Sequence, residues 1–567
     1  MVMVVGVVSA TLLIGLYGVR LARTTSDFFV ATRSVGPWWN ASAIAGEYLS
    51  AASFLGIAGL VMKSGASVMW YPVGYAAGYL VLLLFVAAPL RRFGAYTIPD
   101  FAEARFASPP LRTVAAVLVL VIGWFYLLPQ MKGAGVTLQL LLGTPYWVGV
   151  VVVGFIVTLA VTLGGMKGVT YVQAFHYWTE LVAISFPAVV LAGTLGLVVD
   201  GGRAPFGDRL PTFPRDTTVT FRADTTVNVA VPLGVEIGGR QVTWPLGVRE
   251  VAGGTAVTFR RGDPVPTAAG IALQDGFSWT LPFPDQSGRS LVAALSLLLA
   301  TVLGTMGLPH ILVRFYTNRD ASSARRTSVG TLALVGGFYF FPWMYAVLGR
   351  VWTPELYVTG DTEVVVLTVP RLLGGAWGEV LAALVAAGAF SAFLSTSSGL
   401  MVSVAGALSH DLAGPVFRST AGDRRRLWYF RGAAALAGVV AVALGMLVRS
   451  FDINVLVGWV FAIAASAFCP LLLLGIWWRR LTRQAAGWGM VTGGLASTLA
   501  ILVTMLAPQR GWAGTLLAQP AIVTVPLAFV VMIWISRRTR PPRQAERILL
   551  QMHAPDRVSQ RMSLAES

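Results

Sequence analysis

Runs of about 20 apolar residues recur along this chain, separated by short polar segments. The hydrocarbon core of a bilayer is about 30 Å thick, and roughly 20 apolar residues in an α-helix cross it. The pattern therefore predicts an all-α polytopic membrane protein with about 13 transmembrane helices. We place these helices at 2–19, 38–62, 68–90, 112–131, 145–165, 172–198, 288–309, 327–349, 376–406, 430–448, 454–477, 485–507 and 514–536.

One long polar segment, 201–287, interrupts this series of apolar runs. It contains two alternating stretches rich in β-branched residues, 217–231 and 255–259, separated by Gly-Gly, Gly-Asp and Pro breaks. Such stretches are typical of short strands joined by turns. We expect a small β-rich insertion outside the membrane; the alternative is a disordered loop.

Basic residues gather in alternate loops, and this decides the expected orientation. The chain is 56% hydrophobic and 12% charged, with a net charge of +17 and a mean hydropathy of +0.71. Cytoplasmic loops collect Arg and Lys, and the inner leaflet is anionic, so the charge points to the bilayer rather than to nucleic acid. We expect a cell-membrane protein with its N-terminus outside and a basic cytoplasmic tail at 537–567. The basic loops are 20–33, 91–112, 167, 314–326, 418–426 and 479–483.

Few residues could support catalysis or bind a resident metal. The chain has one cysteine, Cys469, and four histidines, which excludes an internal disulfide and a cysteine-based metal site. No nucleophile–base pair or phosphate-binding glycine loop stands out. We expect no enzyme activity and no cofactor.

The segment 42–60, SAIAGEYLSAASFLGIAGL, is unusual for a membrane helix. It carries Glu47, Ser50 and Ser53 inside an apolar run. A carboxylate near mid-membrane costs roughly 2.5–3.5 kcal/mol on insertion scales, so it is a functional candidate. Small residues around Ala45–Gly46 predict a break in the helix, which is tolerated where the freed carbonyls line a cavity or bind an ion. The alternative is a packed small-residue helix with Glu47 in a structural hydrogen bond.

A second unusual segment, 387–409, is rich in hydroxyl groups. Ala392, Ser395 and Thr396 fall at i, i+3 and i+4, on one helical face. Hydroxyl oxygens suit a small hard cation. The alternative is that these hydroxyls return hydrogen bonds to their own helix.

A third segment, 304–314, reads GTMGLPHILVR, and its Gly and Pro residues predict a kink. His310 and Arg314 would follow the kink at the cytoplasmic edge, where the arginine anchors the helix end. Interrupted helices at matching positions of two halves are typical of transporters built from inverted repeats. Five spans each would form the repeats, at 37–198 and 288–478, flanked by an extra helix at 1–20 and two helices at 484–536.

The chain also resembles the sodium:solute symporters over most of 25–480. The resemblance lies in SDFFVATRSVGPWWNASAIAGEYLSAASFLGI (26–57), RRFGAYTIPDF (91–101), QMKGAG (130–135), GGMKGVTYVQ (164–173), GTMGLPHILVRFYT (304–317) and AGALSHDL (405–412). It implies the leucine-transporter-like fold with one extra N-terminal helix. The AG-acid-Y-x-SAASFLG and GLPHIxxRF runs are most similar to the cation/acetate branch.

Carried over by motif, the family's cation site uses the backbone carbonyls of Gly46, Leu49 and Ala392 and the hydroxyls of Ser395 and Thr396. These are the positions that the spacing argument also selects. At two positions the sequence departs from the pattern of other branches of the family, which makes proline and sugar poor candidates for the substrate. Tyr48 stands where proline-type members carry an important aspartate, and Ser53 aligns with the substrate glutamine of sugar-type members. Glu47 replaces the aspartate usual in the acetate branch.

These features together predict a secondary transporter that works by alternating access. We expect it to couple a cation, Na⁺, to the uptake of acetate or another short-chain monocarboxylate. Glu47, Ser50, Ser53 and Thr305 are the candidate substrate residues. Coupling to H⁺ through a protonated Glu47 stays open, as do symport of an amino acid or vitamin and a symporter-like sensor. The expected partners are a small carboxylate, Na⁺ or H⁺, and the lipid bilayer; the sequence assigns no oligomeric state.

Overall fold

The computed structural model describes residues 2–21, 35–95, 97–195, 210–284, 288–318, 320–413, 423–542 and 544–555. Some of the residues discussed above lie outside this range. They are Arg23, Arg33, Arg319 and Arg418 of the basic loops, 26–34 and Tyr96 of the motifs, 196–198 of the sixth span, 201–209 and 285–287 of the insertion, and Arg543 and 556–567 of the tail.

Each of the 13 predicted spans is helical over most of its described residues. The first half contains α1 (Val2–Leu21), α3 (Pro37–Tyr48), η2 (Ala52–Gly56), α4 (Ile57–Ser64), η3 (Gly65–Met69), α5 (Trp70–Phe85), α6 (Ala87–Phe93), α7 (Ile98–Phe106), α8 (Pro109–Leu142) and α9 (Tyr146–Leu195). The second half contains α11 (Arg289–Thr305), α12 (Pro309–Tyr316), α13 (Ala321–Phe338), α14 (Phe340–Trp352), α15 (Glu355–Thr359), η4 (Thr362–Val364), α16 (Val365–Thr368), η5 (Val369–Leu373), α17 (Gly375–Gly406), η6 (Ala407–Leu412), α19 (Asp423–Gly445), α20 (Ile453–Trp477), α21 (Arg483–Leu506), α22 (Gly511–Ala518), α23 (Ala521–Arg538) and α24 (Ala545–His553).

The helices have the length and composition of membrane spans. Within the described residues, nine helices are long and apolar enough to cross a bilayer, or up to ten if the bent pair α11–α12 counts as one span. Two shorter apolar helices, Val2–Gly15 and Tyr146–Thr162, add to these. At 1.5 Å per residue, the 50 residues of α9 would extend about 75 Å, far more than one bilayer core. This helix therefore supplies both predicted spans, 145–165 and 172–198.

The first helices of the two predicted repeats are both interrupted. In the first, α3 ends at Tyr48 and helical structure resumes at Ala52, with Leu49 at φ −76° and ψ 81°. The break thus lies three residues beyond the expected Ala45–Gly46. In the second, α11 and α12 meet at 41° across Met306–Leu308. The repeat boundaries themselves remain a prediction.

Gly46 serves close helix packing rather than the break. A Cβ at this position would stand 2.4 Å from the carbonyl oxygen of Gln173 on α9. The absence of a side chain therefore lets the backbones of α3 and α9 approach each other.

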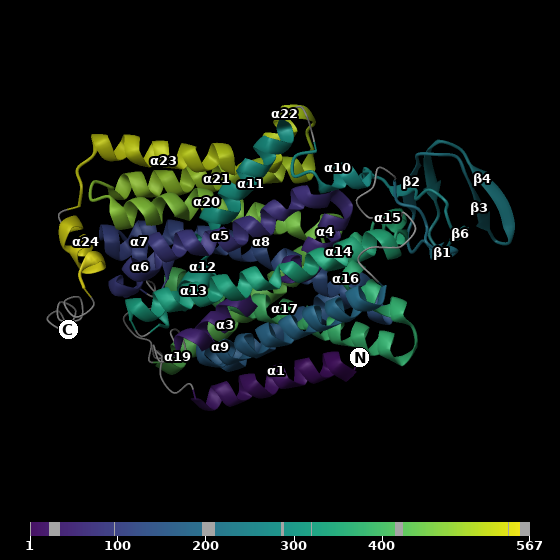
Figure 1. The fold of residues 1–567 in the computed structure, drawn as a ribbon. Helices are drawn as coiled ribbons and strands as arrows, with labels where there is room; N and C mark the ends of the chain where they lie inside the picture. Colours follow the sequence, from purple (N-terminus) through teal and green to yellow (C-terminus); the bar gives the residue numbers. More distant parts are fainter. Residues whose placement is uncertain are drawn as a thin grey trace.

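Figure 1 shows the helices lying side by side in one bundle, with α23 and α21 along one edge and α1 along the opposite edge. Helix α1 packs against α9 and α17, and α21 packs against α23 and α20. The N-terminus and the β-strands lie at one end of the bundle, and the C-terminus lies at the other (Figure 1).

The predicted β-rich insertion is confirmed for its described part. Seven strands form two antiparallel sheets, with orders β1-β6-β3-β4 and β5-β2-β7. Val219, Val227 and Val257 alternate with exposed neighbours and fill the core between the sheets. Gly238 and Gly239, both at positive φ, form the tight turn of the β3–β4 hairpin. The strands are β1 (Thr217–Thr220), β2 (Thr225–Val229), β3 (Leu233–Ile237), β4 (Arg240–Trp244), β5 (Gly247–Val251), β6 (Ala256–Phe259) and β7 (Thr267–Ala268), followed by α10 (Gly276–Thr280).

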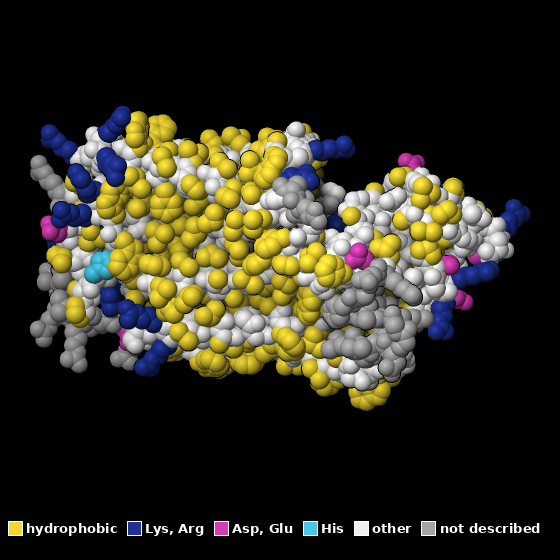
Figure 2. Space-filling model, turned by 45° about the horizontal axis from the view of Figure 1, so that its top comes forward, with side chains coloured by type: hydrophobic (Ala, Val, Ile, Leu, Met, Phe, Trp, Pro, Cys, Tyr) yellow, Lys and Arg dark blue, Asp and Glu magenta, His cyan; other side chains and the backbone are white. Residues whose placement is uncertain are grey.

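The outer surface of the helix bundle is apolar, as contact with the lipid of a bilayer requires. Figure 2 shows a broad apolar belt around the helices, with Lys and Arg side chains gathered at the end opposite the insertion. Exposed tryptophans near helix ends fit the aromatic girdle at a membrane interface. They include Trp38, Trp147, Trp377, Trp477, Trp512 and Trp534.

The last described helix, α24, returns to the end of the bundle and packs on α6, α7 and α20. Met552 is fully buried there, and its carbonyl oxygen accepts a hydrogen bond from Arg92 at 3.4 Å. The His553 ring lies 4.6 Å from that of Trp477 and is hydrogen-bonded to the Ile476 carbonyl at 3.0 Å. The basic tail therefore begins with a docked helix.

Candidate substrate and cation sites at the broken helices

The break in span 2, the second predicted span (38–62), lies against α17. This agrees with the hydroxyl pattern of 387–409, which suggested an ion site on α17. The Thr396 hydroxyl donates to the carbonyl oxygen of Glu47 at 2.7 Å. Ser395 is fully buried, and its hydroxyl has no hydrogen-bond partner among the described residues. Ala392 on the same face is fully buried, as is Leu49 at the break. The structure thus places the hydroxyl face of α17 beside the interrupted backbone of span 2.

Glu47 is held in a buried ion pair. Its carboxylate accepts a hydrogen bond from Arg314 Nε at 2.7 Å, and both side chains are about 1% exposed. Arg314 also donates to the hydroxyl of Thr170 at 2.6 Å and to the amide oxygen of Gln173. Three elements, α3, α12 and α9, therefore meet at one guanidinium group. The expectation that Arg314 anchors a helix end at the cytoplasmic edge is wrong, because the side chain points into the bundle and neutralises Glu47.

The helix opposite this ion pair has no room for a larger residue. A Cβ at Gly399 of α17 would stand 1.7 Å from Glu47 Oε1. Gln173, one of the arginine's acceptors, also donates to the Ser395 carbonyl at 3.1 Å. The ion pair and the hydroxyl face of α17 are therefore parts of one hydrogen-bonded network.

The other candidate substrate residues, Ser50, Ser53 and Thr305, form hydrogen bonds with protein groups near the break. Ser53 Oγ lies 2.8 Å from the hydroxyl of Tyr339. Thr305 donates to the Thr301 carbonyl at 2.7 Å, and its Oγ1 lies 3.0 Å from the Tyr48 hydroxyl. The Tyr48 hydroxyl also donates to the Tyr75 carbonyl at 3.3 Å. Ser50 Oγ accepts from the amide of Ala52 at 3.2 Å, inside the break.

A cluster of tyrosines surrounds these hydroxyls. The Tyr48 ring packs on Tyr75 and Tyr79, with centroids 5.8 and 4.9 Å apart, and Tyr75 stacks on Tyr339 at 6.0 Å. The hydroxyls of Tyr75 and Tyr79 are buried and have no partner within the described part of the chain. Buried polar groups normally have partners, so these two hydroxyls are candidate ligand-binding groups.

His310 adds to this set of unpaired groups. It is about 2% exposed, and neither ring nitrogen has a hydrogen-bond partner among the described residues. Its ring lies 5.2 Å from that of Tyr126, edge to face. The expected position at an interface is therefore replaced by one in the bundle interior, directly after the break between α11 and α12.

Ion pairs close the bundle at the end that carries the insertion. Lys132 contacts Glu363 at 2.7 Å, and Glu363 also accepts from the amide of Ile453 at 2.6 Å. A half-exposed pair joins Lys63 to Asp452 at 3.1 Å. These contacts link α4, α8 and η4 to the start of α20.

Comparison with known proteins identifies the family of this chain and agrees with its broken helices. The model of the sodium:solute symporter family matches residues 28–196 and 253–493. The chain belongs to the sodium:solute symporter family. As a member, it is a multi-pass membrane transporter whose co-substrates are a solute and Na⁺.

Two relatives match nearly the whole of this symporter. One is "Uncharacterized symporter YwcA" of Bacillus subtilis, 32% identical over 534 residues, which cover 92% of this chain and 91% of the relative. The other is a "Monocarboxylic acid transporter" of Corynebacterium glutamicum, 30% identical over 562 residues, which cover 94% and 90%.

Solved structures show that the symporter has the leucine-transporter-like fold. A substrate-bound, outward-open Na⁺-coupled sialic acid symporter superposes with a TM-score of 0.68 at 15% identity and covers 96% of this chain and 98% of its own. The nucleobase-cation symporter MHP1, in a closed conformation, gives 0.51 at 14% identity and covers 94% and 100%.

The sequence missed several residues of this site. Tyr75, Tyr79, Tyr126 and Tyr339 were not selected, although Tyr71, Tyr75 and Tyr79 recur every fourth residue and so share a face of one apolar span. That periodicity was the available signal. No signal in the sequence predicts the bond of Glu47 to Arg314, because 267 residues separate the two.

Proposed function

We propose that this symporter couples Na⁺ to the uptake of acetate or another short-chain monocarboxylate. The observation that carries the proposal is a set of three donors near the two breaks that have no hydrogen-bond partner among the residues that the structure describes. They are the hydroxyls of Tyr75 and Tyr79 and the ring of His310. Two or three neutral donors in a dry site suit the two oxygens of a small carboxylate. The candidate hydroxyls Ser50, Ser53 and Thr305 lie around the same tyrosines.

The charge balance favours a small anion as well. Arg314 lies beside the break, and Glu47 already neutralises it. A substrate carboxylate would therefore be held by hydroxyls, a ring N–H and helix-end amides rather than by a salt bridge. Such a site gives modest affinity and releases its ligand readily. The relative from Corynebacterium, named a monocarboxylic acid transporter, supports this substrate class.

The cation would bind on the opposite side of the break, between span 2 and α17. The proposed ligands are the carbonyls of Gly46, Leu49 and Ala392 and the hydroxyls of Ser395 and Thr396. Support comes from the unpaired, fully buried hydroxyl of Ser395 and from the contact of Thr396 with the Glu47 carbonyl. Hard oxygen ligands suit Na⁺. Because the ion would bridge two helices, its release would free them to move and open the substrate site.

One Na⁺ with one monocarboxylate moves no net charge, so in this stoichiometry only the ion gradient drives uptake. Each further cation would add about 2.3 kcal/mol per 100 mV of membrane potential. Glu47 is a poor proton carrier, because its carboxylate is paired with Arg314. The coupling ratio can be read from the voltage dependence of uptake.

The proposed orientation in the cell membrane has the N-terminus and the insertion outside and the C-terminus in the cytoplasm. The basic end of the bundle in Figure 2 supports it. The only native cysteine, Cys469, is fully buried, so single cysteines at Arg240 and Arg540 can be labelled against a low background. A membrane-impermeant thiol reagent on whole cells should label the first and spare the second; the reverse pattern would invert the assignment.

Uptake of labelled acetate into proteoliposomes tests the function. We expect uptake driven by an inward Na⁺ gradient and blocked by propionate and pyruvate but not by proline or glucose. Uptake of a different solute would keep the family and discard the substrate. Absence of Na⁺ dependence would discard the cation site.

A matched pair of variants tests the donor set. Tyr79→Phe removes a hydroxyl without a partner among the described residues, so we expect a raised KM for acetate at unchanged stability. Tyr345→Phe removes a hydroxyl that donates to the Ile184 carbonyl at 3.3 Å, so its effect should be on stability, by about 1 kcal/mol. An unchanged KM in Tyr79→Phe would remove this residue from the site.

A further inference from the structure

A second group of buried titratable side chains lies on α9, beginning at His176, whose ring contacts Thr11 of α1. His176 and Glu180, one helical turn apart on α9, are both fully buried. Neither oxygen of the Glu180 carboxylate has a hydrogen-bond partner among the described residues, and the same is true of His176 Nδ1. Residues at i and i+4 of a helix share one face, with Cβ atoms about 5–6 Å apart.

The contact with α1 fixes the tautomer of the histidine. The Thr11 hydroxyl donates to the Val7 carbonyl at 2.7 Å, so its single proton is used. Thr11 Oγ1 also lies 2.8 Å from His176 Nε2, and must therefore accept from an Nε2–H group. In the neutral ring Nδ1 is then an acceptor, available to a proton donor on the same helical face.

Glu180, one turn further along α9, can supply such a donor, and it can do so only when protonated. An ionised carboxylate without a partner is very costly inside a membrane protein. The neutral acid has an O–H group, and His176 stands four residues earlier on the same face of α9. A proton therefore resolves both unpaired groups at once.

The charged and titratable groups on the neighbouring helices do not neutralise Glu180. Glu47 of α3 pairs with Arg314, Arg350 of α14 donates to the Gln274 carbonyl, and Glu379 lies in an exposed turn at the start of α17. Of the tyrosines on this side, Tyr177 and Tyr345 donate to the carbonyls of Leu334 and Ile184.

The site is also unsuited to a metal cation. Na⁺ needs several hard oxygen ligands, whereas Thr11 supplies a hydroxyl already engaged twice. The described part of α1 that packs here, 2–15, is otherwise apolar apart from Ser9.

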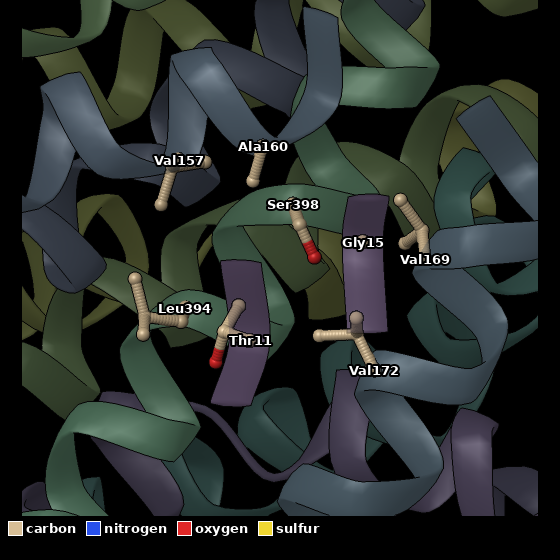
Figure 3. Close-up of a pocket in the computed structure, with 8 residues that line it drawn as sticks. All are labelled: Thr11, Gly15, Val157, Ala160, Val169, Val172, Leu394 and Ser398. Carbon is tan, nitrogen blue, oxygen red and sulfur yellow. The ribbon is translucent and has the colours of Figure 1, made fainter. Parts of the chain in front are cut away.

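The helices are loosely packed beside this site. Figure 3 shows a small cavity between α1, α9 and α17, lined by Thr11, Val169 and Val172 among others, with the hydroxyl of Ser398 pointing inward. Its volume of about 20 Å³ is room for roughly one water molecule. Thr11 thus borders both the cavity and the histidine.

We propose that Glu180 and His176 form a proton-binding site within the membrane, at the contact of α1 with α9. The proton resides on the Glu180 carboxyl and is hydrogen-bonded to His176 Nδ1. Loss of the proton leaves a carboxylate that α1 cannot cover, so deprotonation requires water to enter between α1 and α9. The site gives this symporter a pH-sensitive group separate from the proposed Na⁺ ligands.

Infrared difference spectroscopy of the purified full-length protein tests the site, because the C=O stretch of a protonated carboxyl group is resolved from that of a carboxylate. We expect a protonated-carboxyl band in the wild type at neutral pH that disappears in Glu180→Gln and persists in the control Glu379→Gln, whose residue is exposed. This measurement does not depend on the proposed substrate.

A second variant tests the partner. His176→Gln keeps an amide donor for Thr11 and removes the Nδ1 acceptor, so we expect the band to shift in frequency. A wild-type spectrum without a protonated carboxyl at neutral pH would overturn the proposal even if Glu180→Gln failed to fold. A band unchanged in Glu180→Gln would overturn it as well, and a band unmoved in His176→Gln would refute the pairing.

Discussion

The ion pair between Glu47 and Arg314 allows a quantitative test of the site architecture. Replacing either partner with glutamine leaves the other charge buried, and breaking a buried pair in this way costs about 3–5 kcal/mol. The arginine variant also leaves the Thr170 hydroxyl and the Gln173 amide without their donor, so its cost should lie at the upper end. Replacing both partners with glutamine removes both charges together.

We therefore expect strong coupling in a double-mutant cycle. Glu47→Gln and Arg314→Gln should each lower the free energy of unfolding by about 3–5 kcal/mol, and the double variant by little more than one of them. Denaturant titration in detergent, followed by tryptophan fluorescence, measures these differences. A loss of 3 kcal/mol corresponds to roughly a 100-fold change in the unfolding equilibrium.

The same molecule provides the control. Lys63 and Asp452 form a pair at 3.1 Å whose side chains are 23% and 32% exposed, and such pairs are worth about 0–1 kcal/mol. If the Glu47 and Arg314 variants cost no more than variants of this pair, or if their costs simply add, the guanidinium is not the element that holds the break to α9 and α12.

Two further substitutions test the contacts of span 2. Thr396→Val should raise the Na⁺ concentration for half-maximal uptake about tenfold, the effect of losing roughly 1.4 kcal/mol of ion binding, while Ser403→Ala on the same helix should not; equal Na⁺ dependence of the two would move the cation elsewhere. Gly46→Ala places a Cβ 2.4 Å from the Gln173 carbonyl and should destabilise the fold by about 1–3 kcal/mol, whereas Gly432→Ala, with no atom within 4 Å, should not. Matching thermal midpoints for both alanine variants would show that α3 and α9 can separate without cost.

Hydropathy was sufficient to locate the spans, because the bilayer imposes length and composition on each one independently of the others. The alternating Val and Thr residues of the insertion likewise located its strands. The break was misplaced by three residues because Gly46 suggests flexibility in the sequence, whereas in the structure it allows contact with α9. A single sequence does not show which of these two roles a glycine has.

The candidate site was predictable where its members share a helix face, as Ser395 and Thr396 do. It was not predictable where partners come from distant segments. Arg314 was assigned to an interface because its helix leads out of the membrane, yet its long side chain reaches Glu47 across the bundle. His310 and the tyrosines of α5 acquire meaning only when their neighbours, and the lack of hydrogen-bond partners among them, are known.

The docked helix α24 also limits how the protein can be handled. Because Met552 is buried against the bundle and His553 lies on Trp477, a shortened form ending before Ala545 would expose apolar surface at the end of the bundle and promote aggregation during purification. An affinity tag or a fluorescent fusion is therefore best attached after His553, where it leaves this anchor intact.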